Sequence, residues 1–192
     1  MRRVDVSNVE ITSAARARRV KEAVDAMGGG SRGMRTVDLS GIVLETDGAA
    51  MAAAALTRHK DTIATLAADG CALSGAGAAR LGKWASNIGS LTELSLADNP
   101  AMGNRGGRAM ADLVATLPNL ETLRLGGTSL GDEGAVEIAA ALKATSSLRV
   151  LSLGANCFGA DGISALVSAL DVNRSLTELF LGAKIDGFCS FK

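Results

Sequence analysis

The residues best suited to chemistry in this chain of 192 residues are one histidine, His59, and three cysteines, Cys71, Cys157 and Cys189. A zinc site needs several Cys or His ligands at short, characteristic spacings, and no cysteine lies at such a spacing from His59. A serine or cysteine nucleophile needs an adjacent base, and no known motif pairs one with His59. We therefore expect His59 to be a surface residue, and Cys71 and Cys157 to be structural.

Two further patterns resemble catalytic or cofactor motifs. Residues 75–80 read GAGAAR, which begins like a dinucleotide fingerprint but has Arg80 in place of the third glycine. Asp132 and Glu133 form a pair of carboxylates, but the first turn of a helix favours acidic residues without any catalytic role. The chain is therefore expected not to be an enzyme, with no catalytic residue, no cofactor and no metal.

An internal repeat of about 28 residues organises the chain. The pattern L-x-x-L-x-L begins at Leu91, Leu120, Leu148 and Leu176, and weaker copies begin at Met1, Met34 and Ile63. Residues 1–192 are thus expected to form a single domain of about seven repeats, the last of them truncated. The first junction is longer than the others, and its surplus lies in the glycine-rich residues 28–33, which we interpret as a solvated loop, with a hinge as the alternative.

Each unit changes its period midway, as expected of a strand followed by a helix. In the unit that starts at Leu120, Leu123 and Leu125 alternate with polar residues, and apolar residues then recur at helical spacing from Val136 to Leu142. Short polar side chains that can accept hydrogen bonds from free backbone N–H groups predict six helix N-termini, at Ser13, Asp47, Ser74, Asn104, Asp132 and Asp161. The predicted fold is an α/β solenoid with parallel strands on the concave face and helices on the convex face.

The repeated motif resembles the leucine-rich repeat family, specifically its ribonuclease-inhibitor-like class with units of 28–29 residues. The resemblance implies that an asparagine at the ninth place of a unit bonds the backbone of adjacent turns, and Asn99 and Asn156 match that place. Cys71 also fits the family pattern and Thr128 fits it less well, whereas Val9, Ile42 and Lys184 depart from it. The resemblance further implies a protein-binding role, since arrays of this family mostly bind proteins.

Composition narrows the classes of partner. The 20 Lys and Arg residues balance 20 Asp and Glu residues, and aromatic residues make up 3% of the chain, so no nucleic acid partner is expected. No stretch is apolar enough for a membrane span, so no membrane partner is expected either. Three scattered cysteines favour a reduced, intracellular and cytoplasmic location. Residues 16–21 carry four basic side chains, which fit either a solvated helix face or a contact with an acidic partner.

Alternation along each strand predicts which side chains line the concave surface, namely the third, fifth, seventh and eighth places of each unit. The charged and aromatic residues at these places are Arg3, Asp5, Asp38, Asp69, Glu93, Asp98, Arg124, Glu178 and Phe180. Two interpretations stay open, a mildly acidic groove that accepts a basic segment and a solvated sheet face without a binding role.

The leading functional hypothesis is a non-catalytic scaffold that binds another protein, or a subunit of a larger assembly. Phe188 and Phe191 near the last repeat are candidates for an end-to-end contact or for a cap over the end. The alternative is a regulator resembling the Ran GTPase-activating proteins, which supply an arginine from a loop between strand and helix. Arg105 is the residue expected on such a loop.

Overall fold

The computed structural model describes residues 18, 22 and 34–182. Strands and helices alternate through residues 34–182, as the repeat predicts. The order is β1 (Thr36–Asp38), α2 (Glu45–Leu56), the short 3-10 helix η1 (Thr57–His59), β2 (Thr65–Ala67), α3 (Gly75–Ala85), β3 (Glu93–Ser95), α4 (Gly103–Thr116), β4 (Thr122–Arg124), α5 (Asp132–Ala144), β5 (Val150–Ser152), α6 (Ala160–Leu170) and β6 (Glu178–Phe180). The unit that starts at Met1, the glycine-rich loop, Cys189, Phe188 and Phe191 lie outside the described residues.

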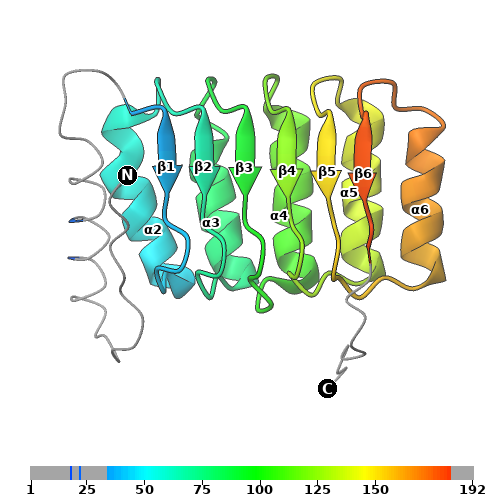
Figure 1. Cartoon of the computed structure of the whole chain (residues 1–192), viewed down its shortest axis with the longest axis horizontal. Coiled ribbons are helices and arrows are strands. Elements are labelled where there is room, and N and C mark those ends of the chain that lie inside the picture. Colours follow the sequence, from blue (N-terminus) through cyan, green and yellow to red (C-terminus); the bar gives the residue numbers. More distant parts are fainter. Residues whose placement is uncertain (1–17, 19–21, 23–33, 183–192) are drawn as a thin grey trace.

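The strands form one parallel sheet of six, paired in chain order from β1 to β6. Equivalent places of neighbouring units lie side by side, so that Val37 aligns with Leu66, and Leu123 aligns with Leu151. Figure 1 shows the strands as one layer and the helices α2 to α6 as a second layer along one side of it. The predicted α/β solenoid is therefore confirmed.

The core lies between these two layers and is built mainly from the leucines of the repeat. Leu94, Leu96, Leu123 and Leu125 are buried, whereas Arg124 between the last two is exposed. This alternation follows from the strand geometry, which sends successive side chains to opposite faces of the sheet. Removal of the leucine side chains from water supplies the main stabilisation of the fold.

Asn99 ties two successive turns of the solenoid together. Its side chain is fully buried, and its Oδ1 accepts hydrogen bonds from the backbone N–H groups of Cys71 and Leu73 at 3.0 and 2.9 Å. Its Nδ2 donates to the carbonyls of Ala68 and Leu96 at 2.9 Å each. Backbone groups that cannot pair within a strand are thereby satisfied inside the protein.

The other ninth-place residues behave in the same way, each to the extent its chemistry allows. Asn156 repeats the pattern, since its Oδ1 accepts from the N–H groups of Thr128 and Leu130 at 3.1 and 3.0 Å. Cys71 donates from its Sγ to the carbonyl of Leu39 at 3.1 Å, and Thr128 donates from its Oγ1 to the carbonyl of Leu125 at 2.7 Å. The role implied by the family resemblance is therefore confirmed for Asn99 and Asn156, whereas Thr128 bonds a carbonyl of its own unit.

The helices α2 to α6 begin within two residues of their predicted N-terminal signals, but among these signals only Ser74 caps its own helix, and Ser13 lies outside the described residues. The Oγ of Ser74 accepts from the N–H of Gly77 at 3.1 Å. Asp47, Asn104, Asp132 and Asp161 were expected to do the same for their own helices, and this expectation was wrong. All four lie within the helices that follow Leu44, Met102, Gly131 and Gly159, which are the capping positions.

Asn104 and Asp132 instead cap the N-terminus of the next helix. Asn104 in α4 accepts through Oδ1 from the N–H groups of Gly131 and Gly134 at the start of α5, at 2.7 and 3.3 Å. Asp132 in α5 accepts through Oδ1 from Gly159 and Gly162 at the start of α6, at 2.7 and 2.9 Å. Each residue satisfies N–H groups that have no partner within their own helix. The contact joins two units, and we call it capping between neighbours.

The turn after each strand requires a left-handed backbone at the eighth place of the unit. Three of these places are glycine, Gly41, Gly70 and Gly127, with φ of 77, 62 and 68°. Asp98 and Ala155 occupy the same place with φ of 55° each. Residues other than glycine rarely adopt a left-handed backbone conformation, although aspartate adopts it more readily than most. Asp98 is therefore held at a strained turn and not on a regular strand.

Candidate functional site

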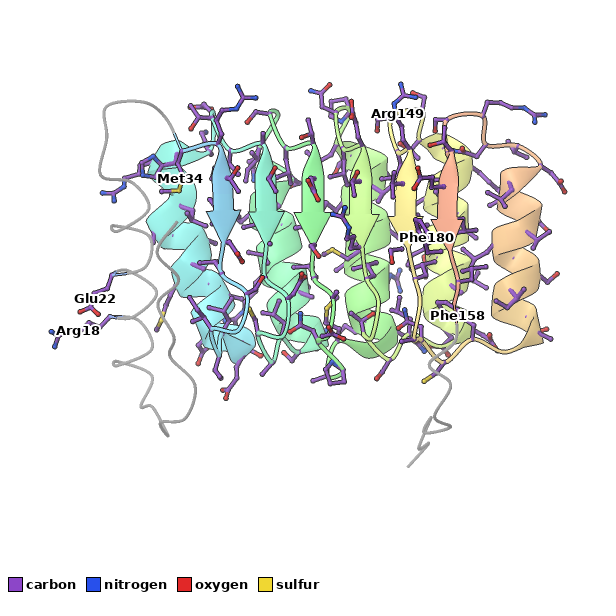
Figure 2. All side chains as sticks on the ribbon, viewed as in Figure 1. Arg18, Glu22, Met34, Arg149, Phe158 and Phe180 are labelled. Atoms are coloured by element: carbon purple, nitrogen blue, oxygen red, sulfur yellow. The ribbon has the colours of Figure 1, made fainter. Side chains whose placement is uncertain are left out.

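The concave surface is the face of the sheet opposite the helices, and it carries the third and fifth places of each strand. Parallel register arranges these places into two rows that cross all six strands. One row consists of Thr36, Thr65, Glu93, Thr122, Val150 and Glu178, and the other consists of Asp38, Ala67, Ser95, Arg124, Ser152 and Phe180. Figure 2 shows the side chains along these strands, with Phe180 labelled on β6 at one end of the sheet.

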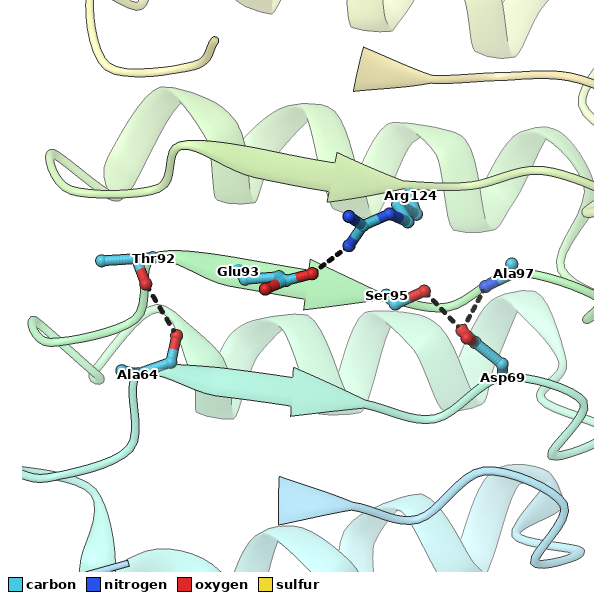
Figure 3. Close-up of polar contacts among 7 residues, drawn as sticks. All are labelled: Ala64, Asp69, Thr92, Glu93, Ser95, Ala97 and Arg124. Carbon is cyan, nitrogen blue, oxygen red and sulfur yellow. Dashed lines mark hydrogen bonds and ion pairs between the residues drawn. The ribbon is translucent and has the colours of Figure 1, made fainter. Parts of the chain in front are cut away.

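Two of the predicted surface residues form an ion pair. A guanidinium nitrogen of Arg124 on β4 contacts a carboxylate oxygen of Glu93 on β3, and both side chains are more than one-third exposed. Arg124 lies opposite Ser95 in the register, so its side chain reaches diagonally to the preceding row (Figure 3). Because the pair is exposed, its contribution to stability is small, and its charges are screened by salt.

Asp69 forms hydrogen bonds with residues of the preceding and the following unit. Its Oδ1 accepts hydrogen bonds from the Oγ of Ser95 at 2.6 Å and from the backbone N–H of Ala97 at 2.8 Å (Figure 3). Its own N–H donates to the Oγ of Ser40 at 3.2 Å. Asp69 therefore connects three units, and this structural role accounts for an acidic residue at this place.

The remaining acids are spread over the surface. Asp38 on β1 is exposed, and its Oδ1 accepts from the N–H of Ser40 at 3.0 Å. Asp98 is exposed at the turn after β3, and Glu178 is exposed on β6. Asp38 and Glu178 lie on the first and last strands of the sheet. Glu93 is paired with Arg124, and Asp69 is hydrogen-bonded to Ser95 and Ala97. The predicted acidic groove therefore has fewer carboxylates left to bind a partner than its composition indicates.

Phe180 places an exposed aromatic side chain at the β6 end of the concave surface. Its side chain is 52% exposed, and it follows Ser152 of the neighbouring strand in its row. After the two strands end, the chain continues through Gly154 and Gly182, which add no side chain. An exposed aromatic ring beside small residues is a typical anchor for a protein partner.

Arg105 does not lie on the expected loop. It is the third residue of α4, which begins at Gly103, and its side chain is exposed. The expectation was wrong because Asn104, interpreted as the start of the helix, already lies inside it. The glycines on either side of Asn104 and Arg105 do not prevent the helix from starting at Gly103.

His59 and Cys71, two of the residues considered for chemistry, lie in different units of the repeat. His59 ends η1, and its Nε2 lies 3.0 Å from the Nε of Arg58. Burial raises the pKa of the Cys71 thiol to about 12, so that it stays protonated at neutral pH. Among the described residues, no group of three or more His, Cys, Asp and Glu side chains is placed to hold a metal ion.

Sequence reasoning placed Ser95 on this surface through its fifth place in the unit, but it missed the contact of Ser95 with Asp69 and missed Thr92. Ser95 bonds Asp69, and the Oγ1 of Thr92 donates to the carbonyl of Ala64 at 3.1 Å (Figure 3). The partners lie 26 and 28 residues apart in the chain, close to the repeat length. Alignment of the units sets Thr92 beside Ala64, because both hold the second place, but it does not set Ser95 at the fifth place beside Asp69 at the seventh.

Residues 34–182 contain no helix long and apolar enough to cross a membrane. A search of curated protein sequences finds no match to the chain. A family model described as a leucine-rich repeat matches residues 90–111, 116–139 and 146–167. These three segments follow one another in units whose strands and helices have the predicted order.

Solved structures with the same fold support this assignment. The tropomodulin C-terminal domain of Caenorhabditis elegans superposes with a TM-score of 0.61 at 18% identity, over 73% of this chain and 84% of that one. Leiomodin-1 Actin-Binding Site 2 superposes with a TM-score of 0.50 at 13% identity, over 93% of this chain and 83% of that one. At these identities the likeness concerns the fold. The matched segments show leucine-rich repeats within residues 90–167, in agreement with the resemblance found in the sequence.

Proposed function

We propose that the chain is a non-catalytic protein-binding module and that its concave surface contacts the partner. The observation that carries this proposal is the row of side chains that crosses six strands on the face away from the helices and is exposed at Asp38, Arg124 and Phe180. The sheet holds these side chains at fixed spacing, so that a partner would be bound with little loss of conformational entropy in the module. Leucine-rich repeat domains generally mediate protein interactions, and one solved structure of this fold is an actin-binding site by name.

The chemistry of the surface indicates the kind of partner. Phe180 offers an apolar contact at the β6 end, and Asp38 and Asp98 offer carboxylates toward the β1 end. A segment that carries an apolar residue and, some strands away, a basic residue would match both. Because the carboxylates are few and exposed, they would affect the rate and salt dependence of association more than its strength.

A photo-reactive amino acid placed in turn at Asp38, Thr122 and Ser152 tests this proposal in native extract. Adducts of one size from all three positions, reduced by Phe180→Ala, are expected. The matched controls are Arg108 and Lys143, which are exposed on α4 and α5 in the helix layer. Adducts that form only from the two helix positions would contradict the proposal.

The repeat class and the cellular location are part of the same proposal. The helices α2 to α6 contain 11 to 14 residues each, which supports the ribonuclease-inhibitor-like class. Three scattered cysteines do not form the dense disulfide framework of small secreted domains, which supports an intracellular location, although Cys157 is disulfide-bonded. Fractionation of cells that produce the full chain tests the location directly.

A further inference from the structure

The core of the solenoid is closed in its interior units and open at its β6 end. The fourth and sixth places of the units of β3, β4 and β5 carry leucines that are at most 1% exposed, namely Leu94, Leu96, Leu123, Leu125, Leu151 and Leu153. The equivalent residues of the last described unit, Leu179 and Leu181, are only partly buried. An interior unit has a neighbour on each side, whereas among residues 34–182 no unit follows β6.

Phe158 shows the same opening at the edge where the strands end. It holds the eleventh place of its unit, where the units of β1, β2 and β4 carry Leu44, Leu73 and Leu130. Those three leucines are fully buried, whereas Phe158 is partly exposed. Figure 2 shows Phe158 at this edge of the molecule. We call Phe158, Leu179 and Leu181 the open end.

Cys157, directly beside Phe158 in the chain, is disulfide-bonded. The sequence contains three cysteines, and Cys71 carries a free thiol. Cys71 is fully buried, and its Sγ donates to the carbonyl of Leu39. Within the chain, Cys189 is therefore the cysteine left to pair with Cys157.

A hydrogen bond holds the last described residue close to Cys157. The N–H of Ala155 donates to the carbonyl of Gly182 at 2.8 Å, and a Cβ on Gly154 would lie 3.1 Å from the same oxygen. Cys189 follows Gly182 by seven residues, and an extended segment of that length spans up to about 24 Å. Cys189 is therefore within reach of Cys157.

The segment that such a bond would tether has apolar side chains to place on the open end. Residues 183–192 read AKIDGFCSFK, and their large apolar residues are Ile185, Phe188 and Phe191. Phe188 directly precedes Cys189, just as Phe158 directly follows Cys157. Because the Cα atoms of two bonded cysteines lie about 4.4–6.8 Å apart, the bond brings both rings into one neighbourhood. Contact between them removes apolar surface from water.

We propose that Cys157 forms its disulfide with Cys189 and that this bond holds Phe188 against the open end. The tethered segment then covers Phe158 and Leu181 as the next unit covers their equivalents at an interior junction. The closure leaves Phe180 exposed on the concave surface, and it does not depend on what that surface binds. The proposed function and the closure can therefore fail separately.

The bond forms by thiol–disulfide exchange with a small disulfide such as oxidised glutathione. One cysteine thiolate attacks the small disulfide and releases one thiol, and the second cysteine thiolate then attacks the mixed disulfide and releases the other. The two cysteines lose two electrons and two protons, and the small disulfide gains them as two thiols. Cys157 is partly exposed, so that a thiol reductant can reach it and reverse the exchange. In an intracellular location, the closure would follow the local ratio of thiol to disulfide.

Tryptic digestion under non-reducing conditions tests the pairing, using the full chain equilibrated at several ratios of reduced to oxidised glutathione and then alkylated. Cys157 lies in peptide 150–174, Cys189 in peptide 185–192 and Cys71 in peptide 61–80. We expect a species that joins peptides 150–174 and 185–192, separates on reduction and comes from a chain of monomer size on a non-reducing gel. Cys71→Ala is the matched control and should retain this species, whereas Cys189→Ser should lose it.

Three results of the digestion would overturn the pairing. They are alkylation of both Cys157 and Cys189 at every glutathione ratio, a link from either of them to peptide 61–80, and a link that occurs only between two chains.

Hydroxyl-radical footprinting tests whether the segment covers the open end. Oxidation of Phe158 should be about threefold slower in the linked wild type than in Cys189→Ser, because a covered aromatic ring loses most of its contact with water. Phe180 is the internal control, since it is 52% exposed and lies in the separate peptide 175–184, and its rate should not change. Phe188→Ser should retain the link and restore fast oxidation of Phe158. Equal Phe158 rates in the linked wild type and Cys189→Ser would overturn the covering, as would slow Phe158 oxidation in linked Phe188→Ser.

Thermal melts measure how much the closure stabilises the fold. The linked wild type should melt at least about 5 °C above the same chain treated with a phosphine reductant, because the bond restricts the unfolded chain. Cys189→Ser should melt at the lower temperature with or without reductant. An equal effect of the reductant on Cys189→Ser, or no effect on wild type, would overturn the stabilising role of the bond.

Discussion

The interior junctions of the solenoid differ from its α6 end in the size and burial of the side chains at the edge of each unit. In the interior, Asn99 is fully buried between two turns, and small residues allow neighbouring helices to touch. At the α6 end, Asn156 is partly exposed and the helix presents larger, exposed side chains. Equivalent places of the repeat thus carry small residues where two described helices touch and larger residues on α6.

The largest difference between the two regions is expected at the ninth place. Asn99→Ala should lower the free energy of unfolding by about 3 kcal/mol, because it leaves buried N–H and carbonyl groups without partners. Asn156→Ala should cost about half as much, since water reaches part of its site. Urea unfolding followed by circular dichroism measures both values. Equal losses would show that the α6 end is as closed as the interior.

Helix packing should show the next largest difference. Ala139→Val adds the side chain that α6 carries at the equivalent place, and overpacking against α6 should lower stability by about 2 kcal/mol. The reverse change at the end, Val167→Ala, removes exposed atoms and should alter stability by less than about 0.5 kcal/mol. Both variants are compared by urea unfolding at a concentration where the chain is monomeric. A large loss in Val167→Ala would mean that Val167, which is 53% exposed, packs against another part of the chain.

Capping between neighbours gives the smallest difference. Asp132→Ala should cost about 1 kcal/mol, the usual value of a lost N-terminal cap, although the helix that loses its cap is α6 and not its own. Asp161→Ala, in the first turn of α6, should cost less than about 0.5 kcal/mol. Hydrogen exchange at Gly159 and Gly162 locates the effect. Faster exchange in α5 alone after Asp132→Ala would argue against capping between neighbours.

Much of the fold could be predicted because it follows from local periodicity. The leucine pattern fixes which strand residues face the core, and constant spacing fixes the parallel register. The same alternation correctly placed Arg124 and Phe180 on the open face of the sheet. Asn99 was identified through the family resemblance, and its bonds have the implied form.

The remaining features depend on contacts between units, which local patterns do not contain. Asp132 has the chemistry of a cap, but a single segment does not show that its partner N–H groups lie 27 and 30 residues away. The pairing of Glu93 with Arg124 joins residues 31 positions apart along a diagonal of the sheet. Because Glu93 is paired with Arg124, the number of acidic residues overstates how many carboxylates of the concave surface can bind a partner.

Capping between neighbours also bears on how such a chain can lengthen or shorten. A duplicated or deleted unit changes which residue precedes each helix start, so that a helix formerly capped by Asp132 could meet Ala160 instead. Insertion of a unit beside α4 or α5 would retain a matching acceptor, whereas insertion after α6 would not. Among the described helices, this capping joins α4 to α5 and α5 to α6, whereas Gly75 of α3 and Ala160 of α6 have no side-chain acceptor at the same place.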